Sequence, residues 1–166
     1  MTLQDLRDYK VISRPVSKID YRGLALYGIG SPAGGAVALG ILKTMEQYNP
    51  ADWSDSNLTL HRFDEAMRFA FAARLQLGDP SFVEGVEAFE SKMLESAAAR
   101  TIKQKISDEH TYPVDYYNPE GIYTSDSHGT SHIVTADRSG MAATLTTTVN
   151  LLFGARLVDM QTGVIV

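Results

Sequence analysis

The chain has 166 residues, 44% of them hydrophobic, which is the length of one ordinary globular domain of roughly 100–200 residues. Its 15 basic and 20 acidic side chains are interspersed and give a net charge of −5, so we expect no nucleic-acid partner, which would need a basic stripe. The chain has no cysteine, which excludes disulfide scaffolds, thiolate zinc sites and a cysteine nucleophile and leaves Ser, Thr, Lys, His or a carboxylate for covalent chemistry.

From the sequence given we expect neither a membrane-spanning segment nor a secretion signal in this chain. The longest nearly apolar stretch, Gly34–Leu42, is far shorter than the roughly 18 residues of a membrane-spanning helix. Met1 is followed by polar residues rather than by the cationic and apolar regions of a signal peptide. The last residues, Gly163–Val166, are those of a strand with no turn after it, so we expect the chain to be an internal fragment of a longer protein.

The first third of the chain combines short strands with one buried helix. Tyr9–Ser13 and Arg22–Tyr27 have the composition of strands. A glycine-rich loop, Gly28–Gly35, then leads into a helix predicted over Ala36–Glu46. Such a loop can bind phosphate, but no Gly-Lys-Ser/Thr follows it, so close packing of the helix is the favoured reason for its glycines.

The middle of the chain is predicted to be helical scaffold. One helix is expected from an N-cap at Thr59 to Gln76, followed by the terminating Leu77–Pro80, and another over Val86–Ile106. The first helix has a face at 3–4 spacing that we expect to form core, made of Leu60, Phe63, Met67, Ala70, Phe71 and Arg74.

The last third changes from helical to strand periodicity. A polar connection without periodicity, residues 107–129, is expected to be mobile. Two strands, Thr130–Ala136 and Met141–Val149, are joined by a turn that ends in Gly140, which predicts a hairpin. Leu157–Val166 predicts a further hairpin.

Hydroxyl and imidazole side chains gather in this last third. Six threonines lie between residues 130 and 150, a composition that strands alone explain. His132 follows Thr130 by two residues, so both project to one strand face, where His132 is either the base of a nucleophile pair or a hydrogen-bonded structural group. The other histidines lack metal-ligand spacing, so we predict neither a metal nor a cofactor. Asn57-Leu58-Thr59 matches a glycosylation sequon.

Taken together, these motifs resemble the gamma-glutamyltransferase (glutathione hydrolase) family. The family's nucleophile segment is matched by Gly129–His132, Asp137, Gly140, Thr146–Leu151 and Phe153-Gly154. The resemblance continues in family order through nearly the whole chain, in Asp5-Leu6, Tyr9, Tyr21–Gly23, Ser31-Pro32, Gly34-Gly35, Glu65-Ala66, Ala70, Ala73-Arg74 and Leu77–Val83.

The resemblance implies a mixed α/β (α+β) fold, the αββα sandwich of N-terminal nucleophile hydrolases, incomplete in this chain. It implies a precursor that cuts itself between Gly129 and Thr130. Residues 1–129 would then be the C-terminal part of the large subunit, and residues 130–166 the N-terminal part of the small subunit.

The resemblance also implies the chemistry and the site residues. Thr130 is expected to take a gamma-glutamyl group from glutathione or a similar amide and pass it to water or to an amino-acid or peptide amine. Thr148 is expected to orient the nucleophile, and Asn150 and Ser131 to bind substrate. Independently of the family, a threonine hydroxyl needs a base, and a new N-terminal amine with a pKa of about 7.7–8.0 can serve as one.

Three readings stay open on the sequence alone. The chain is part of a gamma-glutamyltransferase, part of a related amide acylase with the same nucleophile, or an inactive truncated product with exposed strand edges. The family's aspartate, oxyanion and arginine segments lie outside this chain, so we expect the chain by itself to be inactive. The resemblance implies a localisation outside the cell, at the cell surface or in the secretory pathway.

Overall fold

The computed structural model describes residues 2–123, 129–149 and 151–165, and these fall into two compact units. The larger unit is Ser13–Tyr123, and the smaller one combines the first twelve residues with those from 124 onward. Among the described residues, no helix has the length and apolar character needed to cross a membrane.

The larger unit begins with an antiparallel hairpin of β1 (Val16–Tyr21) and β2 (Leu24–Ile29). Arg22 and Gly23 form its two-residue turn, both with positive φ, as such turns require. The strand predicted over Arg22–Tyr27 is therefore present but shifted. The one predicted over Tyr9–Ser13 is wrong, because the first strand begins only after Pro15.

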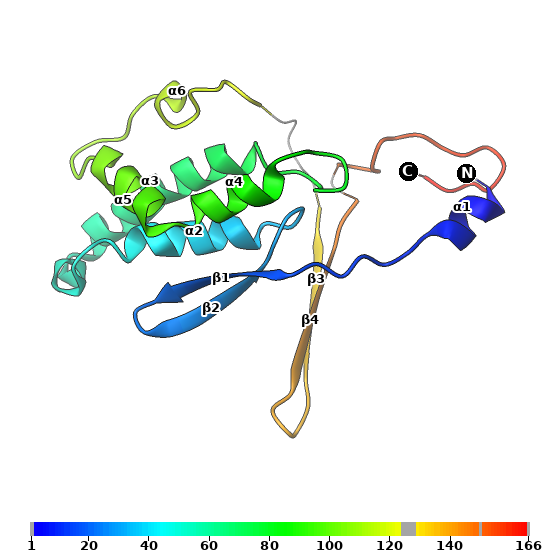
Figure 1. Cartoon of the computed structure of the whole chain (residues 1–166), viewed down its shortest axis with the longest axis horizontal. Coiled ribbons are helices and arrows are strands. Elements are labelled where there is room, and N and C mark those ends of the chain that lie inside the picture. The colour runs from blue at the N-terminus through cyan, green and yellow to red at the C-terminus, as the bar shows by residue number, and fades with distance from the viewer. Residues whose placement is uncertain (1, 124–128, 150, 166) are drawn as a thin grey trace. The chain divides into compact units, whose positions relative to one another are not determined.

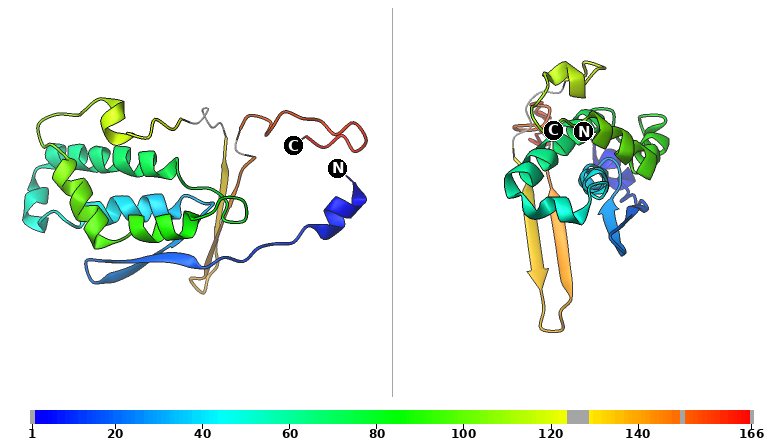
Figure 2. Two further views of the ribbon diagram at one scale, coloured as in Figure 1. Left: turned by 45° about the horizontal axis from the view of Figure 1, so that its top comes forward. Right: turned by 90° about the vertical axis from the view of Figure 1, so that its left-hand side faces the viewer.

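The helices of this unit lie on one side of the β1–β2 hairpin (Figures 1 and 2). In chain order they are α2 (Gly35–Met45), the 3-10 helix η1 (Pro50–Ser54), α3 (Ser56–Arg74), α4 (Val86–Met93), α5 (Ser96–Lys105) and α6 (Val114–Tyr117).

Two of the helix predictions are wrong. Helix α3 begins three residues before Thr59, because the carboxylate of Asp55 accepts hydrogen bonds from the backbone N–H groups of Asn57 and Leu58. The single helix predicted over Val86–Ile106 is two helices, interrupted at Leu94 and Glu95.

The core of the larger unit joins α2 to α3. Val37, Ile41 and Met45 of α2 pack with Ala66 and Ala70 of α3. The face predicted for α3 is only partly buried, since Leu60 is 68% exposed and Phe71 50% exposed. Ala70 of that face is nevertheless in the core and Met67 packs against it, so α3 contacts α2 through part of the predicted face together with Ala66.

The glycine-rich loop before α2 packs tightly against β2. A Cβ atom on Gly35 would lie 2.4 Å from the carbonyl oxygen of Ile29 and 2.5 Å from its nitrogen. Close packing as the reason for this glycine is thereby confirmed. Ser31 in the same loop donates its N–H and its hydroxyl to the buried carboxylate of Glu90 on α4, at 2.8 and 2.6 Å.

The connection after α5 contacts α3 between Ser107 and Tyr117. Asp108 accepts two hydrogen bonds from the guanidinium of Arg62, at 2.8 and 2.7 Å. The hydroxyl of Tyr117 on α6 donates to the fully buried carboxylate of Glu65 at 2.7 Å, and burial raises the pKa of Tyr117 to about 12. The mobility expected for this connection stays a prediction, and residues 124–128 lie outside the described part.

The described residues of the smaller unit form one helix and one regular hairpin. Helix α1 (Leu3–Asp8), which the sequence did not predict, is capped by the reciprocal hydrogen bonds of Thr2 and Asp5. Strands β3 (Ser131–Ala136) and β4 (Ala142–Thr147) pair antiparallel, which confirms the predicted hairpin. The further hairpin predicted near the C-terminus is reduced to one bridge between Val158 and Ile165.

The packing of the glycine loop predicts different effects for two adjacent substitutions. Gly35→Ala is expected to lower the free energy of unfolding by about 2–3 kcal/mol, because backbone atoms of β2 must move away from the new methyl group. Gly34→Ala is the matched control, since a Cβ there meets nothing within 4 Å, and its loss should stay below about 1 kcal/mol. Urea unfolding followed by the fluorescence of the single tryptophan, Trp53, measures both, and equal losses would contradict this account.

Candidate active site

The candidate nucleophile, Thr130, lies directly before β3 in the smaller unit. The hairpin pairs Ser131 with Thr147 and His132 with Thr146, so Thr130 and Thr148 follow at the open end of the same ladder. Thr130 is exposed. The register thus brings together two threonines that are 18 positions apart in the sequence.

The register also decides which side chains share a face of the hairpin. Directly opposed residues project to the same face, and successive residues of a strand alternate. Thr130, His132, Thr146 and Thr148 therefore occupy one face. Ser131 occupies the other, so the hairpin itself does not place it beside Thr130.

The hydroxyl of Thr148 reaches the peptide bond that the family resemblance marks for cleavage. Its Oγ1 donates a hydrogen bond to the carbonyl oxygen of Gly129 at 3.0 Å. A donor at this oxygen withdraws electron density from the carbonyl carbon and stabilises negative charge that develops on the oxygen during nucleophilic attack. Sequence reasoning assigned Thr148 to orienting the nucleophile and missed this contact with the carbonyl.

Gly129 has a left-handed backbone conformation with φ +89°. A Cβ atom on Gly129 would meet nothing within 4 Å among the described residues. Glycine is therefore favoured at this position by its backbone conformation rather than by crowding around the bond.

His132 forms a hydrogen bond across the two strands. Its Nδ1 lies 2.8 Å from Oγ1 of Thr146, its direct partner in the ladder. This contact agrees with the structural alternative that the sequence left open for His132. The other substrate-binding candidate, Asn150, lies outside the described residues, so its role and that of Ser131 stay predictions.

The turn between β3 and β4 is organised by one carboxylate. Oδ1 of Asp137 accepts hydrogen bonds from the N–H of Ser139 at 2.8 Å and of Met141 at 3.1 Å, and from the hydroxyl of Ser139. These donors, the Ser139 hydroxyl first, hold the pKa of Asp137 below its usual value. Gly140 supplies the positive φ that closes the turn.

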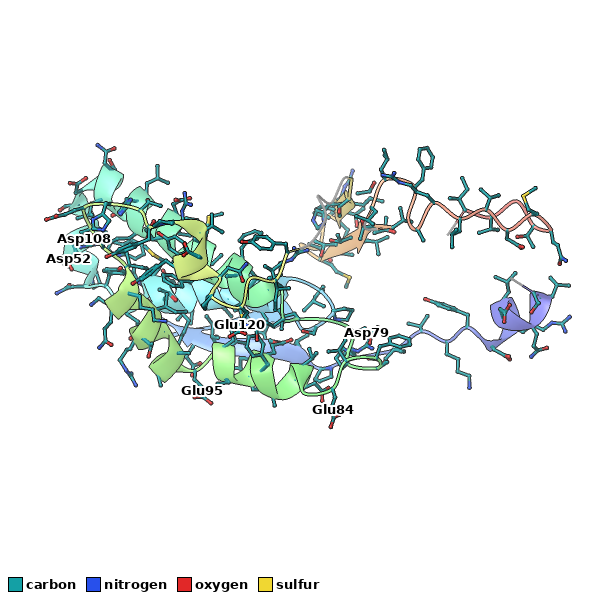
Figure 3. The ribbon with its side chains drawn as sticks, turned by 90° about the horizontal axis from the view of Figure 1, so that it is seen from above. Asp52, Asp79, Glu84, Glu95, Asp108 and Glu120 are labelled. Atoms are coloured by element: carbon teal, nitrogen blue, oxygen red, sulfur yellow. The ribbon has the colours of Figure 1, made fainter. Side chains whose placement is uncertain are left out.

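In the described part of the chain, the acidic side chains outside the hairpin form no cluster that could bind a metal ion. Asp52 and Asp108 lie at one end of the larger unit in Figure 3, but Asp108 is engaged by Arg62. Asp79, also labelled there, is paired with Arg14. Among the described residues, no group of three or more acidic or histidine side chains could hold a metal ion.

The Asp137 turn predicts a pH dependence of the hairpin. A carboxyl group whose pKa is lower in the folded chain contributes stability above its unfolded pKa, and this contribution is lost as the pH falls through the folded value. In an NMR titration, we therefore expect the amide proton resonances of Ser139 and Met141 to shift together on acidification, as their hydrogen bonds to Asp137 are lost. Asp137→Asn should abolish this step, and an unchanged titration in that variant would contradict the assignment to Asp137.

Comparison with known proteins gives one consistent result. The family model described as Gamma-glutamyltranspeptidase matches residues 1–166. A glutathione hydrolase proenzyme of Arthroderma benhamiae is 45% identical over 99% of this chain and 28% of its own length. Glutathione hydrolase 3 of Arabidopsis thaliana is 36% identical over 99% of this chain and 26% of its own length.

A solved structure is similar as well. The crystal structure of Helicobacter pylori gamma-glutamyltranspeptidase is matched with a TM-score of 0.63 and 30% identity, over 69% of this chain and 33% of that chain. The predicted mixed α/β class, part of an N-terminal nucleophile hydrolase fold, is thereby confirmed. The chain spans little more than a quarter of the length of the curated relatives named above. By its match over every residue and its identity to glutathione hydrolases, the chain belongs to the gamma-glutamyltranspeptidase family.

Proposed function

We propose that Thr130 is the nucleophile of a gamma-glutamyl-transferring enzyme and that it first cuts the chain at Gly129-Thr130. The observation that carries this proposal is the hydrogen bond from the hydroxyl of Thr148 to the carbonyl oxygen of Gly129. A hydrogen-bond donor at this carbonyl oxygen stabilises the negative charge that develops there when a nucleophile attacks the carbonyl carbon. Family membership and the proenzyme names of relatives add support.

The proposed cut proceeds through an ester. Oγ1 of Thr130 attacks the carbonyl carbon of Gly129 while the hydroxyl loses its proton, and Thr148 stabilises the charge on the carbonyl oxygen. The bond from this carbon to the nitrogen of Thr130 then breaks, and the nitrogen takes up a proton to become an amine. Water hydrolyses the remaining ester, which leaves a carboxylate on Gly129 and restores the hydroxyl of Thr130.

After the cut, the same residue supplies the nucleophile and its base. A free α-amine with a pKa of about 7.7–8.0 is partly unprotonated near neutral pH and can accept the proton of the Thr130 hydroxyl. The hydroxyl of Thr148, no longer required at Gly129, is then available to orient Thr130. This is the arrangement of a nucleophile, an adjacent base and an orienting group.

The proposed donor is glutathione or another gamma-glutamyl amide, because the relatives are named glutathione hydrolases. The amide carbonyl of the donor takes the place that the Gly129 carbonyl occupies before the cut. The glutamyl group is held as an ester on Thr130 while the amine leaves. Water completes hydrolysis, and an amino-acid or peptide amine completes transfer.

The proposed cut predicts a pattern in three variants. The purified chain should yield two fragments separated between Gly129 and Thr130, and Thr130→Ala should stay intact. Thr148→Val should slow the cut by about tenfold or more, because the carbonyl loses its donor. Thr147→Val, one position away on the opposite face, should cut at the wild-type rate. Intact mass spectrometry over time measures all four chains, and an uncut wild-type chain would contradict self-cleavage.

The proposed transfer predicts a dependence on the glutamyl group. The assay uses the full-length protein that contains this chain. This protein should release aniline from a gamma-glutamyl anilide, and its Thr130→Ala variant should not. An acyl anilide of equal chain length without the α-amino and α-carboxyl groups is the matched substrate control and should not be turned over. Turnover of the control alone would instead indicate an acylase with the same nucleophile.

A further inference from the structure

The open end of the β3–β4 hairpin is where the atoms of the proposed cut meet. Thr148 and Gly129 lie just beyond the last strand pair, Ser131 with Thr147. The turn organised by Asp137 closes the opposite end, five residue pairs away from the Ser131–Thr147 pair. Strand pairs fray most easily at the end far from their turn. The contact at Gly129 therefore depends on whatever holds the open end closed.

Side-chain contacts across the ladder contribute to this hold. Each residue of β3 and of β4 is exposed among the described residues, so the contacts that the structure shows for these side chains are those between the two strands. Directly opposed side chains are close enough to stabilise the pairing of two strands.

The cross-strand pair of His132 and Thr146 lies close enough to the open end to keep the two strands paired there. It is one residue pair inside the last pair, on the face that carries Thr130 and Thr148. Among the described residues, it is the one hydrogen bond that joins a side chain of β3 to a side chain of β4. Thr135 makes a longer contact, 3.5 Å to a backbone oxygen, nearer to the turn.

We infer that His132 and Thr146 are positioning residues for the proposed self-cleavage, and that their hydrogen bond keeps Thr148 at the carbonyl of Gly129. The inference rests on the proposed function, because it assigns these residues a task in the same cut. Neither residue touches the bond that breaks. They act through Thr148, by raising the fraction of chains in which its hydroxyl reaches Gly129.

The test compares the rate of the cut in variants of Thr146. Thr146→Val keeps the shape and the strand preference of the side chain but removes the hydroxyl, and it should slow the cut by about two- to tenfold. Thr146→Ser keeps the hydroxyl and should cut near the wild-type rate. A role in strand stability alone predicts the reverse order, because valine favours strands and serine does not.

Two controls sharpen the comparison. Thr144→Val makes the same change on the same face of β4, at a hydroxyl with no hydrogen bond among the described residues, and should have no effect. His132→Phe should slow the cut as much as Thr146→Val, and the double variant should be no slower than either, because both remove one shared contact.

The outcomes separate this inference from the proposed function. If the wild-type chain is cut and Thr146→Val is cut equally fast, the positioning role is wrong and the proposed nucleophile stands. If Thr146→Ser is slower than Thr146→Val, strand stability is the cause, and if the two are equally slow, the hydroxyl is not what matters; either result makes the positioning role wrong. If the wild-type chain is never cut, the proposed function fails and the inference fails with it.

Discussion

The register of the β3–β4 hairpin is the constraint on which the candidate site depends. Pairing of Ser131 with Thr147 decides that Thr130 and Thr148 meet at the open end and share a face. A slip of one residue would turn Thr148 to the other face and take its hydroxyl away from the carbonyl of Gly129. The chemistry proposed for Thr130 thus depends on a ladder whose turn is organised by Asp137 and whose open end is bridged by His132 and Thr146.

In the larger unit, the connection that follows α5 is attached to α3 by side-chain hydrogen bonds. Two buried polar side chains on α3 have partners among the residues that come after α5: one carboxylate oxygen of Glu65 accepts from Tyr117, and Arg62 donates to Asp108. An unpartnered buried carboxylate would be costly, so these contacts favour a docked connection at least as far as α6.

The sequence predicted elements with strong local signals and missed features that depend on tertiary contacts. The turn ending in Gly140 located the hairpin, and the glycines before α2 correctly indicated close packing. The start of α3 was misplaced because Thr59 was predicted as the cap, whereas Asp55, four residues earlier, binds the backbone N–H groups. Periodicity correctly placed Ala70 in the core but also placed Leu60 there, which is mostly exposed. The hydrogen bond from Thr148 to Gly129 depends on the register of the β3–β4 hairpin, and no local sequence pattern predicts that register.

The central claim is that Thr130 itself attacks the carbonyl of Gly129, and the ester it forms is the direct sign of that attack. Hydroxylamine added to the freshly purified, uncut chain should intercept the ester and leave a hydroxamate on the C-terminus of the Gly129 fragment. Mass spectrometry distinguishes this product from the carboxylate that hydrolysis leaves. The account predicts faster cleavage with hydroxylamine and a hydroxamate at Gly129. A Gly129 fragment that always ends in a carboxylate, formed at a rate that hydroxylamine does not change, would contradict it.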